Sequence, residues 1–333
     1  MTTDLGLEKR IELLTQLGKY MLSDAPEWMD IQARAVSANA WFTPGHISLA
    51  INNIATEFLQ KDKLETWAAG YLLPKQPKTI GIVMAGNIPL VGFHDFLCGF
   101  MSGHSLLIKL SSKDAVLLKH LIAKLAEWEP AVASQVQIAE RLNNCDAYIA
   151  TGSNNTARYF EQYFGKYPNI IRKNRTSVAL LDGTETDDEL ALLADDVYLY
   201  YGLGCRNVTQ VYVPRDYDFA RLLNIFNRHN DYADLNKYKN NYDYHLAIYL
   251  LNRIPYMSNE SLLMVENDMP FSAVSVLHYK YYDNKDTLID SLLKSEEIQA
   301  IIGHGFIPFG DSQKPALSDY ADGVDTMDFL CRV

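Results

Sequence analysis

The chain has 333 residues, of which 48% are hydrophobic and 21% are charged, and its formal net charge is −11. This length is typical of two packed domains, and the composition is that of a globular protein. The acidic balance disfavours nucleic acid as a partner, because the surface repels phosphate backbones. No apolar run resembles a signal peptide or reaches the length of a membrane span. The four scattered cysteines form no CxxC pair, so we expect a cytoplasmic protein with no metal site and no disulfide framework.

The first half of the sequence alternates between helical and strand patterns. Residues 4–61 are expected to be helical, with a break at Thr43-Pro44-Gly45, where Pro and Gly stop one helix. Short apolar runs bounded by turn residues then indicate buried parallel strands. The further elements expected here are strands over Thr79–Met84, Ser105–Leu110 and Ala147–Ala150, and helices over Leu90–Met101, Ala115–Trp128 and from Asn154 to about Phe164.

The second half continues the alternation without repeating the sequence. The elements expected here are strands over Ser177–Leu181, Thr209–Val213 and Ser272–Tyr279, and helices over Asp187–Tyr200, Tyr217–Asn227 and Lys285–Lys294. Alternation of this kind predicts an α/β fold built on parallel strands with helices on both faces. The boundary between the two domains is predicted near residue 180.

Cys205 is the first candidate for chemistry. It follows a Gly-x-Gly turn in Tyr-Gly-Leu-Gly-Cys-Arg-Asn, residues 201–207. The glycines let the backbone approach a ligand, and Arg206 can favour the thiolate. The alternative is a small buried hydrophobic residue, and the local sequence weighs the two about equally. The remaining cysteines lack such a turn and are predicted to be structural: Cys98, Cys145 and Cys331.

Asn87 is the second candidate, in Gly86-Asn87-Ile88-Pro89, between a predicted strand end and a predicted helix start. Ligands of open α/β sheets bind outside the carboxyl ends of strands, and an Asn there can aim its amide at a developing oxyanion. Asn is also a common helix cap and turn residue. On this segment alone, the cap is favoured.

Two further segments suit an anionic ligand. Gly152-Ser153 lies between a strand and a helix start, where backbone N–H groups and the helix dipole favour a pyrophosphate. The alternative is an ordinary turn with a serine cap. Lys109, at a strand end, is placed either to hydrogen-bond a ribose or phosphate or to be solvated. No standard GxGxxG or GxxxxGK[ST] motif is present.

The order of these segments carries a resemblance. Gly-Asn-Ile-Pro-Leu, Gly-His-Ser-Leu-Leu-Ile-Lys, Ala-Thr-Gly-Ser and Gly-x-Gly-Cys follow one another as in the aldehyde dehydrogenase superfamily. More narrowly, Tyr-Gly-Leu-Gly-Cys-Arg-Asn-Val-Thr and the tail Leu-Ser-Asp-Tyr-Ala-Asp-Gly-Val-Asp-Thr, residues 317–326, resemble LuxC-type acyl-CoA reductases. These are the fatty-acid reductase subunits known from bacterial bioluminescence. The resemblance covers about residues 75–330.

The resemblance implies an architecture. Residues 1–180 would form a Rossmann-type nucleotide-binding domain, together with a helical N-terminal region, a reduced oligomerisation arm and the tail 310–333. Residues 181–309 would form an α/β domain that carries the catalytic thiol. A homo-oligomer is also expected from the superfamily.

The resemblance also implies roles for single residues. Cys205 corresponds to the nucleophile and Asn87 to the side chain of the oxyanion hole. Lys109 corresponds to the contact with the adenosine ribose, and Gly152 and Ser153 to the turn beside the cofactor phosphates.

The sequence departs from the superfamily pattern at two places. Hydrolytic members carry a Glu-Leu-Gly-Gly segment whose Glu activates water, whereas the corresponding residues 173–178 here contain no Glu. This favours acyl transfer with CoA over release of a free acid. Many NAD-preferring members have a Glu three residues after the Lys, where this chain has Ser112. Because Ser112 leaves room for a 2′-phosphate and Lys113 can help to hold it, we expect NADPH as the cofactor, with NADH as the alternative.

These features predict an oxidoreductase that takes an acyl group from acyl-CoA onto Cys205 and reduces it to an aldehyde, which is expected to be a fatty aldehyde. The first alternative is a CoA-acylating aldehyde dehydrogenase that acts on short acyl chains. The second is an acyl-binding or acyl-transfer subunit without reductase activity. A catalytically silent α/β scaffold with a buried Cys205 is the remaining possibility.

Overall fold

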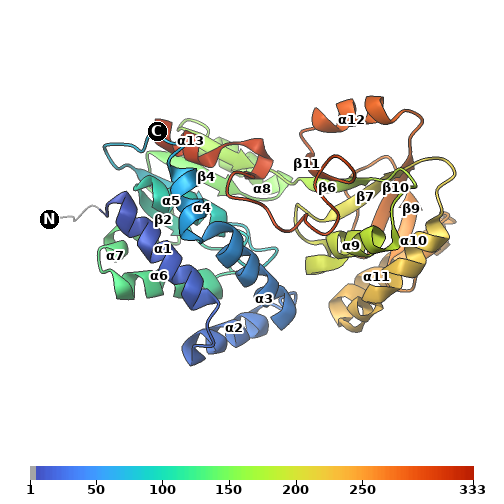
Figure 1. Ribbon diagram of the computed structural model, residues 1–333, viewed down its shortest axis with the longest axis horizontal. Helices are drawn as coiled ribbons and strands as arrows, with labels where there is room; N and C mark the ends of the chain where they lie inside the picture. Colours follow the sequence, from blue (N-terminus) through green and yellow to red (C-terminus); the bar gives the residue numbers. More distant parts are fainter. Residues whose placement is uncertain (1–4) are drawn as a thin grey trace. The chain divides into compact units, whose positions relative to one another are not determined.

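The computed structural model describes residues 5–333, which form two compact units, each with its own sheet (Figure 1). The first unit contains the chain through Asn174 and the C-terminal Pro315–Val333, and the second contains Arg175–Lys314. The predicted α/β class with parallel strands is therefore confirmed. The division places residues 175–180, which lie before the predicted boundary, in the second unit.

The first unit begins with helices, as predicted, although the expected start at Asp4 lies outside the described residues. The helices are α1 (Leu7–Met21), α2 (Pro26–Ala38), α3 (Pro44–Asn53) and α4 (Lys61–Ala68), with a π-helical turn over Ile54–Phe58. The predicted break near Thr43-Pro44-Gly45 is present between α2 and α3, but Pro44 and Gly45 do not end a helix, because α2 already ends at Ala38. Pro44 opens α3, whose first turn is capped by a hydrogen bond from the His46 backbone N–H to Thr43 Oγ1 at 3.1 Å. Pro suits this position because a first-turn N–H would have no helical partner.

The first sheet has five strands in the order β3-β2-β1-β4-β5, and all of its pairs are parallel. The strands are β1 (Thr79–Val83), β2 (Ser105–Lys109), β3 (Val136–Ile138), β4 (Ala147–Thr151) and β5 (Asn169–Arg172). Val83, the last residue of β1, pairs with Lys109 of β2 and with Ala150 of β4. The carboxyl ends of these three neighbouring strands therefore meet at one edge of the sheet.

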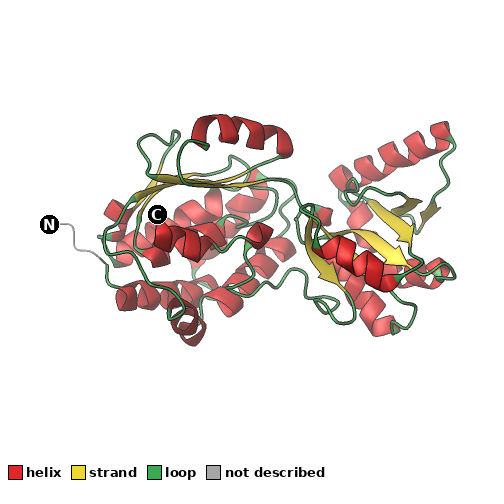
Figure 2. Cartoon of the chain, turned by 90° about the horizontal axis from the view of Figure 1, so that it is seen from above, coloured by secondary structure: helices red, strands yellow, loops and turns green. Residues whose placement is uncertain are grey.

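Helices cover both faces of this sheet (Figure 2). They are α5 (Phe93–Ser102), α6 (Val116–Trp128), α7 (Val132–Gln135) and α8 (Asn154–Phe164). The helix predicted from Leu90 begins three residues later, because Leu90 has a left-handed backbone with φ of 56°. One apolar core joins α5 and α6 to the strands and to the N-terminal helices, with Trp28, Phe93 and Leu121 fully buried in it.

The second unit contains a sheet of six strands in the order β11-β6-β7-β10-β9-β8, parallel except for the β8–β9 pair. The strands are β6 (Thr176–Leu180), β7 (Val208–Val213), β8 (Met257–Ser258), β9 (Leu263–Glu266), β10 (Val276–Tyr281) and β11 (Ile298–Ile302). The helices are α9 (Asp187–Tyr198), α10 (Phe219–Phe226), α11 (Asn236–Asn252) and α12 (Lys285–Leu293), with 3₁₀ turns over Leu199–Gly202 and Asn227–Asp234.

Two element boundaries predicted for the second unit are wrong for one shared reason. The helix expected to reach Tyr200 ends at Tyr198, because Tyr200 and Tyr201 have left-handed backbones. The strand expected from Ser272 begins at Val276, directly after Ser275, whose φ is 64°. A residue with a left-handed backbone ends a regular helix or strand, and for a non-glycine residue the amino-acid type does not predict this conformation.

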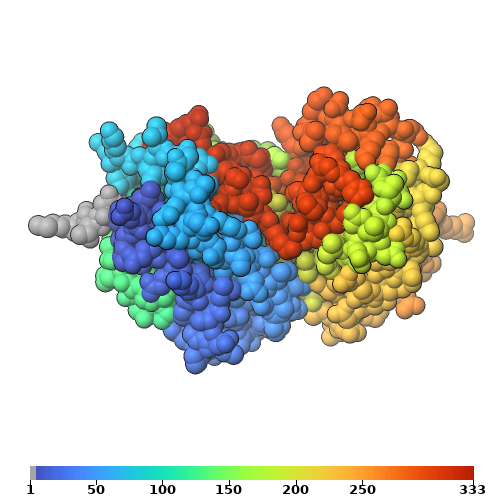
Figure 3. All heavy atoms as spheres, in the orientation of Figure 1, coloured from blue at the N-terminus to red at the C-terminus, as the bar shows by residue number. Residues whose placement is uncertain are grey.

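The C-terminal segment packs onto the first unit, where it ends in α13 (Thr326–Arg332) after a 3₁₀ turn over Ala321–Gly323. The buried Arg172 forms an ion pair with Asp95 of α5 and donates a hydrogen bond to Thr326 Oγ1 at 2.8 Å. His94 Nε2 donates to the Leu317 carbonyl at 3.0 Å. In Figure 3 the red C-terminal residues accordingly lie against the light-blue residues of the first unit. Among the helices of residues 5–333, none has the length and hydrophobicity that a bilayer crossing requires.

We predict that Asp95→Ala destabilises the first unit by about 3–5 kcal/mol, because it leaves the Arg172 guanidinium buried without its counter-charge. The side chains of this pair are only 6% and 7% exposed. The midpoint of urea unfolding measures the effect. The matched control is Asp283→Ala, which breaks the Arg215–Asp283 pair, whose side chains are 71% and 76% exposed, and should leave the midpoint unchanged. Equal shifts in the two variants would contradict the prediction.

Candidate active site

A strained turn leads into the predicted nucleophile. Between α9 and β7, three consecutive residues adopt left-handed backbones, with φ of 54° at Tyr200, 58° at Tyr201 and 71° at Gly202. Both tyrosines are buried, and Cys205 three residues later is partly exposed. The interpretation of Cys205 as a fully buried core residue therefore does not hold.

Asn207 holds this turn in place, and it is a residue that the sequence reasoning missed. Its side chain is fully buried. The amide nitrogen donates to the carbonyls of Asp196 at 3.1 Å and Leu199 at 2.8 Å, and the amide oxygen accepts from the Gly204 N–H at 2.8 Å. One side chain thus ties the end of α9 to the residue before Cys205. The only sequence feature that could have indicated this role is the position of Asn207, two residues after Cys205 in the same motif.

The backbone of Cys205 has a second support. Ser177 Oγ, on β6, donates to the Cys205 carbonyl at 3.0 Å, and Ser177 is fully buried. Ser177 belongs to residues 173–178, the segment in which the sequence analysis found no glutamate. In this chain that segment therefore contributes a side chain that anchors the backbone of Cys205.

Burial affects the thiol groups of the other three cysteines. Burial raises the pKa of Cys98 well above its ordinary value, and it also raises the pKa of Cys145 and of Cys331. Cys98, on α5, and Cys145, before β4, are buried. A raised pKa lowers the fraction of reactive thiolate, which agrees with the prediction that these cysteines are structural.

Asn87 is exposed in the turn after β1. It does not cap a helix, because the N-cap of α5 is Gly92. The cap interpretation favoured on the segment alone is therefore wrong. The turn is compact: a Cβ atom placed on Gly86 would lie 2.4 Å from Ser111 Oγ, so only glycine lets this turn approach the loop after β2.

The remaining predicted residues lie at the same edge of the first sheet. Lys109 ends β2, and Ser112 follows it in an exposed loop. Gly152 and Ser153 follow β4, next to β1 on the other side. The structure thus brings these four residues and Asn87 to three adjacent strand ends, whereas Cys205 belongs to the second unit.

Ser153 is the N-cap of α8, where its Oγ accepts from the Thr156 N–H at 3.3 Å and contacts Thr156 Oγ1 at 2.9 Å. The serine cap is therefore present, and it places the positive end of an 11-residue helix at this edge. Residues 109–113 contain two exposed lysines, Lys109 and Lys113, and no acidic residue. A helix N-terminus and two cations at the carboxyl ends of parallel strands suit the phosphates of a dinucleotide.

Two other features do not form a competing site. Asp182, Glu185 and His304 lie close enough to share an ion, but Lys285 Nζ is 2.9 Å from Asp182 Oδ2 and His304 Nε2 is 2.9 Å from Glu189 Oε1. A lysine that already neutralises the carboxylate opposes a bound cation.

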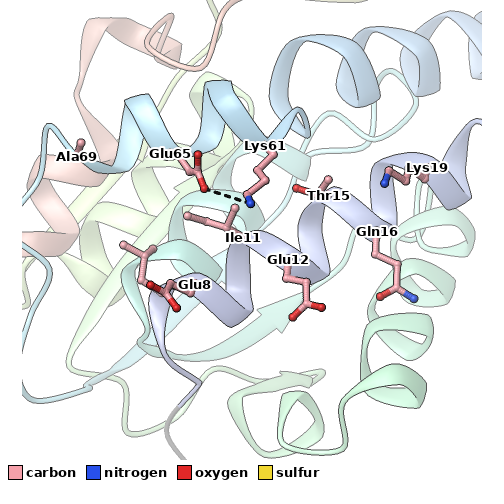
Figure 4. A pocket seen from close by; sticks show the side chains of 10 residues that line it. Glu8, Ile11, Glu12, Thr15, Gln16, Lys19, Lys61, Glu65 and Ala69 are labelled. Atoms are coloured by element: carbon pink, nitrogen blue, oxygen red, sulfur yellow. Dashed lines mark ion pairs between the residues drawn. The ribbon is translucent and has the colours of Figure 1, made fainter.

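The groove between α1 and α4 in Figure 4 is lined by ion-pairing side chains such as Lys61 and Glu65, and contains none of the predicted site residues.

Comparison with known proteins places the chain in a family. A model of the acyl-CoA reductase (LuxC) family matches residues 27–223, and no curated protein sequence matches. A putative aldehyde dehydrogenase from Burkholderia cenocepacia has 14% sequence identity and a TM-score of 0.66 over 85% of this chain and 71% of its own. The putative aldehyde dehydrogenase PutA from Anabaena variabilis has 13% identity and a TM-score of 0.66 over 93% and 76%. An NADP-dependent enzyme from E. coli has 12% identity and a TM-score of 0.66 over 90% and 74%. The chain thus has the aldehyde dehydrogenase fold and belongs to the LuxC family of acyl-CoA reductases.

Proposed function

We propose that this protein reduces acyl-CoA to an aldehyde through a thioester on Cys205. The observation that carries the proposal is the partly exposed Cys205 at the end of a rigid, strained turn in the motif that resembles the family most closely. Backbone strain of this kind is found at sites where the surrounding structure holds a reactive group in place. We further propose the second unit as the thiol domain and the first as the nucleotide-binding domain.

In the first step, the Cys205 thiolate attacks the thioester carbonyl carbon of acyl-CoA. The Asn87 amide and the backbone N–H of Cys205 stabilise the oxyanion; loss of one such donor costs about 2.7–4 kcal/mol in a protease. When the tetrahedral adduct collapses, the bond to the CoA sulfur breaks and CoA leaves as a thiolate. The acyl group remains on Cys205 as a new thioester, so one difficult step becomes two easier ones.

For the second step, the residues that would hold NADPH are Lys109, Ser112, Gly152 and Ser153. The bound cofactor would supply the hydride that reduces the acyl carbon. The resulting thiohemiacetal on Cys205 releases the aldehyde when its carbon–sulfur bond breaks, which regenerates the thiolate. The absence of a glutamate from residues 173–178 supports aldehyde rather than acid as the product, because no carboxylate there activates water.

We predict that Cys205→Ala forms no acyl-enzyme, because the only proposed nucleophile is gone. Intact-mass spectrometry after incubation with tetradecanoyl-CoA, without cofactor, should find the mass of one acyl group on the wild type and none on the variant. The matched control is Cys331→Ala, which removes a partly exposed cysteine of the first unit and should retain the label. Full labelling of Cys205→Ala would end the proposal.

The product separates this function from its alternatives. With NADPH and a series of acyl-CoAs, a long-chain reductase should release aldehyde fastest from long chains. A preference for short chains would indicate a CoA-acylating aldehyde dehydrogenase. Acyl-enzyme without aldehyde would indicate an acyl-transfer subunit.

We predict that Asn207→Ala slows acyl-enzyme formation and destabilises the second unit by about 1–3 kcal/mol, since buried backbone groups lose their partner. Asn207→Asp keeps an acceptor for the Gly204 N–H but loses both donated bonds, so it should also be impaired. Thermal unfolding and the labelling rate measure the two effects. Asn241→Ala, which removes one bond to the Lys237 carbonyl on α11, is the control that should change neither.

We predict that Ser112→Glu weakens NADPH by about tenfold and NADH much less, because the added carboxylate repels a 2′-phosphate. Fluorescence titration of each cofactor measures the dissociation constants. Ser134→Glu adds the same charge on α7, beside the amino end of β3, and should leave both constants unchanged. Equal weakening of NADH and NADPH by Ser112→Glu would argue against a phosphate at this position.

A further inference from the structure

A buried acid links the turn after β1, which carries Asn87, to the loop after β2, which carries Ser112. Asp114 ends the loop after β2 and is 7% exposed. Its Oδ2 accepts a hydrogen bond from the Leu90 N–H, in the turn after β1, at 2.8 Å. Its Oδ1 is buried and has no hydrogen-bond partner within residues 5–333. The proposed chemistry gives this carboxyl group no role.

The contact fixes a backbone conformation that is unfavourable by itself. Leu90 has φ of 56°, a region that disfavours a side chain and costs about 1–3 kcal/mol. The Leu90 N–H is satisfied because it donates to Asp114, and Gly86 lets the same turn pack closely against Ser111. The position of Asn87, between Gly86 and Leu90, follows from these two contacts.

The loop of Asp114 is itself held from another side. Asn39, after α2, donates from Nδ2 to the Lys113 carbonyl at 3.0 Å, and the Asp114 N–H donates to the Ser111 carbonyl at 3.1 Å. Ser112 lies within this braced segment. A displacement of Asp114 would therefore move both the turn of Asn87 and the loop of Ser112.

Burial raises the pKa of Asp114 to about 8, and the backbone N–H groups of Leu90 and Val91 oppose that rise. The turn over residues 85–92 has no ionisable side chain. The charged side chains nearest in sequence are exposed lysines on the strand, the loop and the helix that adjoin Asp114: Lys109, Lys113 and Lys119. At neutral pH the group is therefore mainly a neutral carboxylic acid, which can still accept the Leu90 N–H.

We propose that Asp114 is a positioning residue that holds the turn of Asn87 in register with the loop of Ser112. This inference rests on the proposed function only for the roles of Asn87 and Ser112. The link between the two loops is a property of the first unit and can be tested without turnover.

Two variants separate the requirement for an acceptor from the requirement for a charge. Asp114→Asn keeps an oxygen for the Leu90 N–H and should form acyl-enzyme at close to the wild-type rate. Asp114→Ala removes the acceptor and should slow acyl-enzyme formation by about 10–100-fold, as small misplacements of a catalytic group do. In the same samples, hydrogen exchange of peptides that cover residues 85–92 should speed up in Asp114→Ala but not in Asp114→Asn.

The pH dependence of stability gives a third readout. The folded protein keeps a proton on Asp114 up to about pH 8, whereas the unfolded chain releases it near pH 4, so wild-type stability falls as pH rises between these values. Asp114→Asn removes this loss. Its stability relative to wild type should therefore increase from pH 5 to pH 8, even if Asp114→Ala does not fold.

Asp146→Ala is the matched control. Asp146 accepts a hydrogen bond from the Thr79 N–H at 2.8 Å, at the start of β1 and so at the opposite edge of the same sheet. It should not change exchange in residues 85–92. The inference is overturned if exchange there is the same in Asp114→Ala and wild type, or if Asp114→Asn behaves like Asp114→Ala. A wild type that forms no acyl-enzyme would instead refute the proposed function and leave the exchange comparison decisive for Asp114.

Discussion

The turn from Tyr200 to Gly202 is the constraint on which the proposed nucleophile depends. Two non-glycine residues in the left-handed region each cost about 1–3 kcal/mol, and such residues persist only where their surroundings leave no alternative. Here the surroundings are the three hydrogen bonds of Asn207 and the packing of Tyr201, whose ring centroid lies 5.0 Å from that of Tyr232. Tyr232, which follows α10, therefore supports the turn by packing against Tyr201. In the proposed function, these contacts would let Cys205 meet a substrate with little further ordering of the turn.

The first unit solves a related problem with the same device. There the turn after β1 contains the left-handed Leu90, and the side chain that satisfies it, Asp114, comes from the loop after the neighbouring strand. In both units a buried polar side chain compensates an unfavourable backbone conformation, and in both the candidate site residue lies within four residues of the strained position. Both the amide oxygen and the amide nitrogen of Asn207 form hydrogen bonds, whereas Oδ1 of Asp114 has no hydrogen-bond partner within residues 5–333. Burial raises the pKa of Asp114 because the backbone N–H groups of Leu90 and Val91 do not replace the hydration that the carboxyl group loses.

The same conformations explain what could be predicted from the sequence. Apolar runs bounded by Gly and Pro correctly located β1, β2, β4, β6 and β7, because a buried parallel strand needs little besides such a run. The turns between them were located because glycines mark them. The failures at Leu90, Tyr200 and Ser275 all involve non-glycine residues with positive φ, where tertiary contacts decide the conformation and the residue type does not. Asn207 and Asp114 were missed for a related reason: a polar side chain that braces a turn looks like any surface residue until its burial is known.

The two segments that most closely resemble the family differ in what they do physically. The segment around Cys205 is held at a candidate site, whereas the tail is built into the core of the first unit. Tyr320 accepts from Trp67 Nε1 at 2.8 Å, and Asp325 accepts from the Tyr71 hydroxyl at 2.8 Å. The tail therefore completes the first unit after the chain has passed through the second. The strand ends that carry Asn87, Lys109 and Ser153 belong to the sheet of this first unit, which the tail helps to complete.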